Sequence, residues 1–275
     1  MNSAREISIE AGRSEGHYWA DVWRHRELFY FLAWRDVLVR YKQTVAGIGW
    51  AVIRPLLTMG VFALVFGSFA QLPSQGMPYP VLVFAALLPW QLFANAISDG
   101  SASLVNSASM ISKTYFPRII VPASSVAVSV VDFLISLVIL GGLMAVYQVT
   151  PGWRALLLPA FLLLALAAAL GVTMLFSALN VRYRDFRYIV GFIVQFGLFI
   201  SPVGFSSAIV PEQWRTLYAL NPMVGIIEGF RWCLAGAPNP PDAAALLLSF
   251  MVSGALLVLG VAYFRRTERT FADVI

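Results

Sequence analysis

Long, unbroken runs of apolar residues constrain this chain more than any other feature of its sequence. A helix needs about 20 mostly apolar residues to cross the hydrocarbon core of a bilayer. Five runs reach that length: residues 46–70, 79–98, 119–148, 155–180 and 243–264. A sixth run, residues 188–209, is interrupted near its end by Ser201, Pro202 and Gly204. The runs are continuous and do not alternate with a period of two, which favours spanning helices over barrel strands.

The composition indicates that lipid, and not water, surrounds most of the chain. Of the 275 residues, 59% are hydrophobic and 12% are charged, whereas a soluble domain usually has about 25% charged residues. We therefore expect an all-α integral membrane protein with six transmembrane helices. Its parts are a cytoplasmic N-terminus over 1–45, a membrane domain over 46–267 and a cytoplasmic tail over 268–275. The N-terminal residues lack an apolar stretch beside a cleavage site, so we expect no signal peptide.

The sequence offers no constellation of residues typical of catalysis or of metal and nucleotide binding. The single cysteine, Cys233, cannot form an internal disulfide, and two histidines without a cysteine pair argue against a structural zinc site. The phosphate-binding pattern G-x-x-x-x-G-K-[ST] does not occur, so we expect no nucleotide on this chain. The pattern H-E-x-x-H is missing too, and no cluster of carboxylates and histidines lies on a predicted water-facing loop, which argues against an enzyme.

Lysine and arginine residues predict the orientation, because cytoplasmic connections carry the excess of these residues. With the N-terminus inside, 15 of them lie in inner connections: seven in 1–45, two in 99–118, three in 181–187 and three in 265–269. The outer connections hold three, which are Arg154, Arg215 and Arg231, and Arg54 lies inside the first run. Both termini are therefore expected in the cytoplasm, and the net charge of +5 does not require nucleic acid as a partner.

Residues 21–43 are predicted to form an interfacial helix. On a helical wheel, one narrow sector contains Trp23, Tyr30, Trp34, Val37 and Tyr41. The basic residues Arg24, Arg35 and Lys42 lie about a third of a turn away from that sector. This pattern is typical of a helix that lies along the inner leaflet in contact with membrane lipids. A helix packed on the cytoplasmic ends of the protein's own spans is the alternative.

Residues 210–240 contain two apolar pieces of about ten residues, each too short to cross a bilayer. The break between them is at Asn221-Pro222, where the proline stops a helix. We interpret the pieces as a re-entrant helix pair that forms a gate, since non-helical backbone at membrane depth must be covered by protein or line a watery cavity. The candidate gate residues are Asn221, Pro222, Glu228 and Arg231. An amphipathic outer loop resting on lipid headgroups is the alternative.

Two ionisable residues lie within the predicted spans, where a charge is costly. Asp132 is near the middle of the third run, and we interpret it as a packing partner between helices, with a transport role as the alternative. Arg54, near the inner end of the first run, either lines a path for an anionic substrate or extends to the inner headgroups. A single carboxylate is too little for a proton relay, which argues against a secondary carrier.

Aromatic and amide side chains suggest a substrate channel. In the second run the candidates are Trp90, Gln91, Phe93 and Asn95. In the sixth run they are Phe192, Phe196 and Phe199, spaced at i, i+4 and i+7, with Gln195 beside them. Flat rings next to amide hydrogen-bonding groups suit sugars, which have apolar C–H faces and polar edges. Helix packing or an interfacial aromatic belt would account for the same residues.

A hydroxyl-rich stretch between the second and third runs lies on the predicted inner side. Ser107 and Ser109 accompany a short predicted helix that has an apolar tip and ends before Pro117. The residues expected to contact a partner are Met110, Ile111, Ser112, Lys113, Thr114, Tyr115, Phe116 and Arg118. Such a tip suits the docking of a separate motor protein, and a plain turn between two spans is the alternative.

Five short motifs, taken in order, resemble one family of transporters. They are GIGWAVIRPLL (47–57), LLPWQLFANAI (87–97), MISKTYFPRIIVP (110–122), LNVRYRDFRYIV (179–190) and NPMVGIIEGFRW (221–232). Their order and spacing are similar to those of the membrane subunit of bacterial type-2 ABC exporters, specifically the O-antigen, capsule and teichoic-acid polysaccharide exporters. The resemblance covers the chain from about residue 25 to its C-terminus, and KTYFPR and LLPWQ look most similar to the O-antigen type.

The resemblance implies a fold, a set of partners and a location. The fold would have six spans, an N-terminal interfacial helix, a cytoplasmic coupling helix at 105–118 and a re-entrant pair before the last span. In the coupling helix, Lys113, Tyr115, Phe116 and Arg118 match the family's motif. The chain would form a homodimer in the bacterial inner membrane together with two copies of a separate ATP-binding subunit. ATP and magnesium would bind to that subunit, and this chain would hold no cofactor.

The substrate implied by the resemblance is a lipid-linked polysaccharide of the O-antigen type that moves outward across the membrane. A capsule or teichoic-acid exporter of the same family and a small-molecule drug exporter with the same fold are the alternatives. A membrane-embedded enzyme acting on lipid-linked sugars belongs to another class. It would need an acidic or metal-binding inner loop, whereas the inner loops of this chain are basic.

Overall fold

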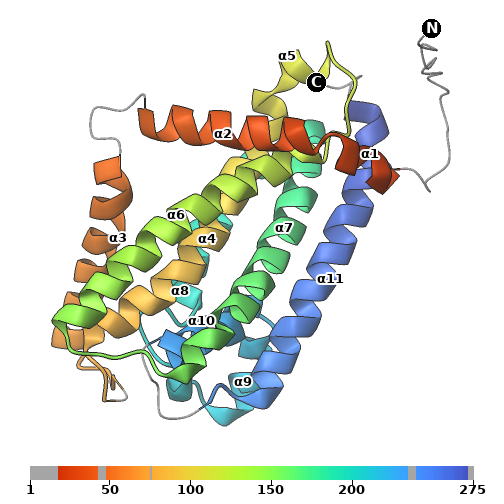
Figure 1. Cartoon of the computed structure of the whole chain (residues 1–275). Coiled ribbons are helices and arrows are strands. Elements are labelled where there is room, and N and C mark those ends of the chain that lie inside the picture. Colours follow the sequence, from red (N-terminus) through yellow and green to blue (C-terminus); the bar gives the residue numbers. More distant parts are fainter. Residues whose placement is uncertain (1–17, 43–47, 75, 235–239, 272–275) are drawn as a thin grey trace, which may run out of the picture.

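The computed structural model describes residues 18–42, 48–74, 76–234 and 240–271 (Figure 1). Within these ranges every regular element is a helix, which confirms the predicted all-α class. Parts of four predicted regions lie outside the described residues. They are residues 1–17 and 43–47 of the N-terminal segment and first run, 235–239 of the re-entrant region and 272–275 of the tail.

The longer helices are α2 (Arg26–Lys42), α3 (Ile48–Phe62), α4 (Tyr79–Asn106), α6 (Ile120–Val146), α7 (Leu158–Arg182), α8 (Phe186–Ile200), α10 (Pro222–Leu234) and α11 (Ala243–Thr267). The short helices are α1 (Tyr18–Arg24), α5 (Ala108–Ile111) and α9 (Glu212–Ala219). A π-helical segment, η2 (Ala63–Phe69), continues α3, and single turns form η3 (Trp153–Leu157), η4 (Ser207–Ile209) and η5 (Glu268–Thr270).

Among the described residues, five helical segments are long and apolar enough to cross a membrane. They are Gly49–Phe69, Tyr79–Asn106, Ile120–Val146, Trp153–Arg182 and Ala243–Thr270. These segments coincide with the five uninterrupted apolar runs, so the sequence predicted their number and places correctly. The reason is that apolar length is a local property of the chain.

Helix α4 is the centre of the bundle. Its most extensive contacts are with α6 and α7, and it also contacts α3, α8 and α10. Buried residues occur all round it, among them Val81, Phe84, Leu88 and Ile97. A helix that is apolar on every face is stable only when other helices cover it, and α4 is the most covered of the five candidate spans.

Helices α7 and α11 approach each other closely at two glycines. A Cβ atom at Gly260 would overlap the carbonyl oxygen of Gly171, and a Cβ at Gly171 would overlap the backbone at Leu256. Small residues at such a crossing let two membrane helices bring their backbones together, which maximises van der Waals contact. The pairing of α7 with α11 is therefore specified at these two positions.

The sixth predicted span is shorter in the structure than in the prediction. Helix α8 has 15 residues and ends at Ile200, and the backbone of the following residue, Ser201, is extended. Pro202 causes this end, because a proline excludes helical geometry at the residue before it. Helix α8 alone falls short of the length of about 20 residues that crosses a bilayer, so the six-span arrangement stays a prediction.

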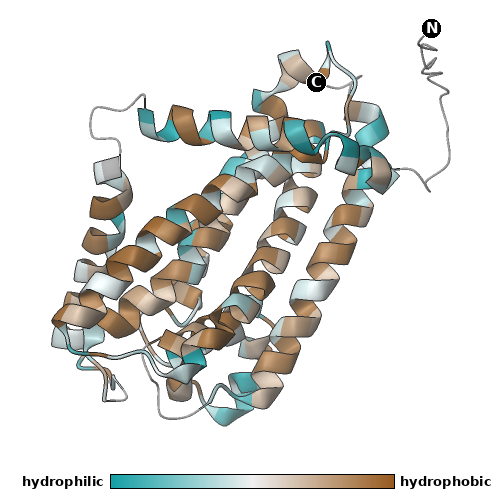
Figure 2. Ribbon diagram, in the orientation of Figure 1, coloured by the Kyte–Doolittle hydropathy of each residue, from teal (hydrophilic) through white to brown (hydrophobic). Residues whose placement is uncertain are grey.

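Several segments far apart in the sequence meet at one end of the bundle. Helices α1, α2 and α5 lie there together with the C-terminal end of α11, while α9 and α10 lie toward the opposite end (Figure 1). Hydrophobic residues run along α4, α6, α7 and α11, and hydrophilic residues gather in α1, α2 and the turns (Figure 2). Helix α2 runs across this end and packs on α6. We call this end of the bundle, formed by α1, α2, α5 and the C-terminal end of α11, the polar end.

Candidate functional site

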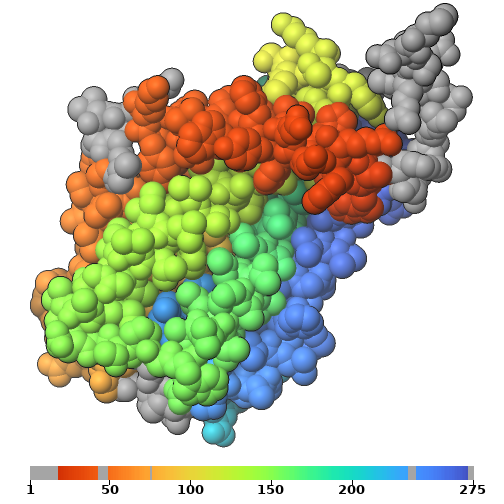
Figure 3. All heavy atoms as spheres, viewed as in Figure 1, coloured from red at the N-terminus to blue at the C-terminus, as the bar shows by residue number. Residues whose placement is uncertain are grey.

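The loop between α4 and α6 projects from the polar end, beyond α2 (Figure 3). Helix α4 ends at Asn106, the single turn α5 follows, and the chain then returns to Ile120 at the start of α6. The exposed residues of the loop are Ser109, Ser112, Lys113, Thr114 and Tyr115, and the side chain of Tyr115 is 80% exposed. We call residues 107–119 the docking loop. Its outer edge presents hydroxyl groups, one ammonium group and one aromatic ring.

The inner side of the docking loop is apolar. Ile111 and Phe116 are only 4% and 5% exposed, and they belong to a buried cluster with Leu104, Ile119 and Phe271. Met110 packs partly against the same cluster. The prediction of an apolar tip is therefore wrong for Ile111 and Phe116, because a short loop gains stability by turning its apolar side chains into the protein. Tyr115 is the exposed aromatic residue of the loop.

Arg118 connects the docking loop to the end of α11. Its backbone N–H donates to Glu268 Oε1 at 2.7 Å, and its guanidinium donates to the main-chain carbonyl of Glu268. The hydroxyl of Tyr18 donates to Glu268 Oε2, also at 2.7 Å. Burial, and then the Glu268 carboxylate, raise the pKa of Tyr18 above its ordinary value, which favours the protonated phenol that donates this hydrogen bond. Arg118, predicted to contact a partner, is thus engaged within the chain.

A polar cluster joins α2 to α4 and α6. The Oδ2 atom of Asp132 lies 2.9 Å from Arg40 and accepts a hydrogen bond from Asn95 at 3.2 Å, while Tyr41 donates to Oδ1. Arg40 also pairs with Asp99 at 3.0 Å. This geometry confirms the interpretation of Asp132 as a packing partner between helices. Asn95, predicted in the channel set, is one of its partners.

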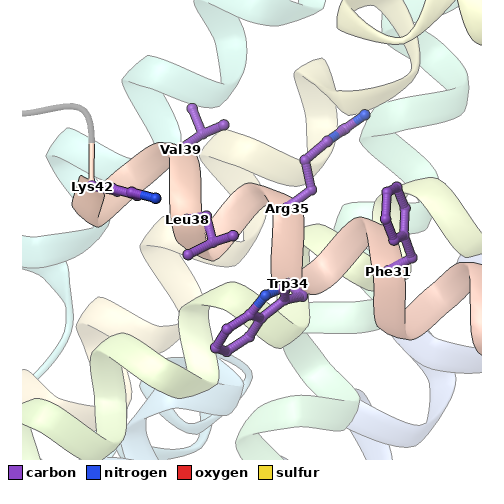
Figure 4. Close-up of a pocket in the computed structure, with 6 residues that line it drawn as sticks. All are labelled: Phe31, Trp34, Arg35, Leu38, Val39 and Lys42. Atoms are coloured by element: carbon purple, nitrogen blue, oxygen red, sulfur yellow. The ribbon is translucent and has the colours of Figure 1, made fainter.

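The outward face of α2 holds a shallow pocket (Figure 4). The residues that line it are Phe31, Trp34, Arg35, Leu38, Val39 and Lys42. They recur every three or four positions and combine apolar with basic side chains, as at a membrane interface. The wheel prediction is only partly right, because Val37 and Tyr41 are partly buried while Trp34 is exposed.

Two of the predicted channel rings lie in the core. Trp90 and Phe93 are buried members of the main apolar cluster, and the Trp90 indole packs so closely on α8 that a Cβ at Gly197 would collide with it. Gln91 beside them is partly buried. These two rings therefore line no open surface of the single chain. Arg54 of α3, in contrast, is exposed.

The other predicted channel residues share one open face of α8. This set consists of Phe192, Gln195, Phe196 and Phe199, all exposed. The rings of Phe192 and Phe196 stack with their centroids 4.1 Å apart, and Phe199 stacks on Phe62 of α3 at 6.0 Å. Helix α8 has one buried residue, Val190. The face of α3, η2 and α8 is thus rich in large apolar side chains that the single chain leaves uncovered.

The predicted gate residues hold the turn that follows α8. The Arg231 guanidinium, 4% exposed, donates to the main-chain carbonyls of Leu82 at 3.3 Å and of Val203 and Phe205 at 2.8 Å. Glu228 accepts from the backbone N–H of Ser207 at 3.1 Å. The Arg231 contacts tie the backbone between α8 and α9 to the start of α4, and the Glu228 contact ties the same backbone to α10.

Helices α9 and α10 occupy the predicted re-entrant region and are separated at Asn221-Pro222, as the sequence indicated. Asn221 donates to the Ser201 hydroxyl at 2.9 Å, and Pro222 is the first residue of α10. Helix α10 packs against α4, α7 and α11 and is mostly buried, whereas α9 is mostly exposed. Between the two helices Leu220 is exposed and Asn221 is partly buried, so the single chain covers this connection only in part.

Sequence reasoning missed Glu268, Tyr18 and Arg40. Tyr18 and Glu268 are separated by 250 positions, and Arg40 and Asp132 lie on different helices. No local spacing reports such contacts. A carboxylate directly after the last apolar helix was the one available signal for Glu268. Within the described ranges, no three His, Cys, Asp or Glu residues are grouped so that they could hold a metal ion.

Comparison with known proteins relates the chain to export permeases. A model of the family described as ABC-2 type transporter matches residues 27–235. The chain is 30% identical over 258 residues to the O-antigen export system permease protein RfbA of Myxococcus xanthus, which covers 93% of this chain and 98% of the relative. Two proteins of the same name from Klebsiella pneumoniae are 27% and 26% identical, each over 88% of this chain and 92% of the relative.

Proposed function

Because this chain belongs to the ABC-2 type transporter family, we propose that it forms the membrane conduit of an exporter for lipid-linked polysaccharide of the O-antigen type. Within the family the chain is the membrane subunit, a transporter component without a catalytic domain. ATP binding belongs to a separate ATPase subunit. The energy for transport therefore reaches this chain through a protein contact.

The substrate class rests on one observation, the similarity to O-antigen export permeases along nearly the whole chain. The exposed rings of Phe192, Phe196 and Phe199 with Gln195 are consistent with it, since aromatic faces and amides suit the two kinds of sugar surface. Capsule and teichoic-acid glycans have the same kinds of surface. We therefore propose a lipid-linked glycan as the substrate, and the similarity to O-antigen export permeases favours the O-antigen type.

The ATPase subunit docks, in this proposal, on the outer edge of the docking loop. Lys113 and Tyr115 supply a charge and an exposed ring there, while Ile111 and Phe116 anchor the loop from below. The loop joins the end of α4 to the start of α6. A displacement of this anchored loop by the ATPase subunit can therefore move α4 and α6 together.

The conduit lies, in this proposal, between two copies of the chain on the face formed by α3, η2 and α8. Large apolar side chains such as Leu57, Val61 and Phe69 are exposed there on the single chain. Helix α8 and its following turn would complete the sixth crossing, and α9 with α10 would close the outer end. Both termini would lie in the cytoplasm beneath the bacterial inner membrane, with the face of α2 shown in Figure 4 along the inner leaflet.

The proposal is tested in cells that lack their own permease but keep the ATPase subunit. The chain should restore polysaccharide on the cell surface, and a variant with Phe196→Trp should restore clearly less, because a larger ring narrows the conduit. The control is Leu247→Trp, which enlarges an exposed residue of α11 away from the proposed conduit. Equal export by both variants would show that this face of α8 does not line the path of the glycan.

A second measurement separates glycan from drug export. In the reconstituted complex, lipid-linked glycan should stimulate ATP hydrolysis, while small apolar drugs should not. Stimulation by drugs alone would contradict the proposed substrate class. It would leave the role of the chain as an ATP-driven conduit intact.

A further inference from the structure

Glu268 lies where three separate parts of the chain meet at the polar end. Its carboxylate accepts from Tyr18 of α1 through one oxygen and from the backbone of Arg118, in the docking loop, through the other. Glu268 itself begins η5, directly after α11. The guanidinium of Arg265 lies 4.7 Å from the centre of the Tyr18 ring, which adds a second link between α1 and the end of α11.

The position of Glu268 makes it a fixed point for the docking loop. Arg118 is the last loop residue but one before α6 begins at Ile120, so its hydrogen bonds hold the returning arm of the loop. Below Glu268, Phe271 is fully buried against Phe264, with ring centroids 5.3 Å apart. Hydrogen bonds to a carboxylate are stronger than those between neutral groups. The loop is thus held by its apolar side chains from below and by Glu268 from the side.

We propose that Glu268 is a positioning residue for energy coupling, acting through the docking loop. This inference rests on the proposed docking of the ATPase subunit at that loop. When the loop is displaced, α6 moves because it is continuous with the loop, and α1 and α11 move because Glu268 joins them to Arg118. Without the carboxylate, the loop rotates about its buried residues Ile111 and Phe116. Its displacement then no longer moves α1 and α11.

The experiment follows the loop with a spin label at Ser109→Cys, an exposed position of the loop, in a background with Cys233→Ser, in the complex of the chain with its ATPase subunit. The test variant Glu268→Gln keeps the size of the side chain and removes its charge. The control Arg269→Gln removes a charge from the next, exposed residue of the same turn. Label mobility, ATP hydrolysis and surface polysaccharide in cells are measured for each variant.

We expect Glu268→Gln to raise the mobility of the label and to lower the polysaccharide exported per ATP hydrolysed several-fold, because the amide offers one acceptor oxygen where the carboxylate offers two. Arg269→Gln should change neither quantity. A result for Glu268→Gln that equals the control in either quantity overturns the proposal. A mobile loop with normal export per ATP would mean that Glu268 only stabilises the fold.

Tyr18→Phe decides the question if Glu268→Gln does not accumulate in the membrane. It removes a single hydroxyl donor and keeps the ring beneath Arg265, so we expect a smaller change in the same direction, and no change refutes the proposal. Failure of the docking role is seen separately. In that case, adding the ATPase subunit would not alter the mobility of the label in the labelled chain that keeps Glu268. This result would not depend on the effect of Glu268→Gln.

Discussion

Arg231 shows how a single buried cation can organise the backbone of a turn. A charge that leaves water is costly unless it finds polar partners. Arg231 has three, the carbonyl oxygens of Leu82, Val203 and Phe205, within 2.8–3.3 Å. The planar guanidinium offers five donors in a fixed fork, which suits several carbonyls at once. This side chain therefore ties the turn after α8 to the beginning of α4.

We expect Arg231→Lys to destabilise the protein by about 2–3 kcal/mol, because an ammonium cannot reach all three carbonyls and leaves buried acceptors unpaired. The melting temperature of the detergent-purified chain should fall by roughly 5–10 °C. Arg215→Lys, an exposed position on α9, is the control and should leave it nearly unchanged. An unaltered melting temperature for Arg231→Lys would show that the three contacts contribute little.

Tyr115 and Phe116 are neighbours in sequence with opposite environments, so the same substitution should have different effects. Tyr115→Ala changes an exposed ring, and we expect normal stability with reduced stimulation of ATP hydrolysis. Phe116→Ala empties a buried site and should cost about 3–5 kcal/mol. Thermal unfolding and ATPase assays on the same preparations distinguish the two. If Tyr115→Ala unfolds the protein as readily as Phe116→Ala, the docking loop is not arranged as described.

At the scale of elements, the crossing of α7 and α11 depends on the absence of side chains at Gly171 and Gly260. Neither glycine was singled out from the sequence, because glycines are frequent in membrane helices and spacing alone does not reveal which of them meet. The break of α8 at Ser201-Pro202 and the break between α9 and α10 at Asn221-Pro222 were predictable, since proline acts on its own neighbours.

Gly260→Ala should separate α7 from α11 and cost about 1–3 kcal/mol through overpacking. Gly254→Ala on the same helix is the matched control, because no atom lies within 4 Å of its new Cβ. The control should be neutral or slightly stabilising, as alanine favours helix over glycine. Melting temperatures of the two variants in one detergent provide the measurement. Equal values would argue that the two helices can shift apart at no cost.

At the scale of the whole molecule, the distribution of lysine and arginine predicts which end faces the cytoplasm. The docking loop and α9 lie toward opposite ends of the bundle (Figure 1). In a Cys233→Ser background, Lys113→Cys should react with a membrane-impermeant maleimide only after cells are opened. Arg215→Cys should react in intact cells. The reverse pattern would invert the predicted orientation and place the docking loop out of reach of an ATPase.

The predicted homodimer is tested on the uncovered face of α3, η2 and α8. Val61→Cys should form a disulfide between two copies in the membrane under mild oxidation, because its exposed side chain lies on that face. Val138→Cys on α6 is equally accessible but lies elsewhere, so it should cross-link poorly. Cross-linking of Val138→Cys alone would move the contact between copies to another face.

The sequence by itself determined the five long helices, the projecting loop after α4 and the proline breaks near the opposite end. All of these depend on apolar length, proline and charge within short segments. Only the tertiary structure decided that Trp90 is buried while Phe196 is exposed, and that Tyr18 meets Glu268 across 250 positions. The reason is that lipid is as apolar as a protein core, so hydropathy cannot separate a lipid-facing or partner-facing ring from a packed one. Polar contacts between distant elements arise only when the chain is folded.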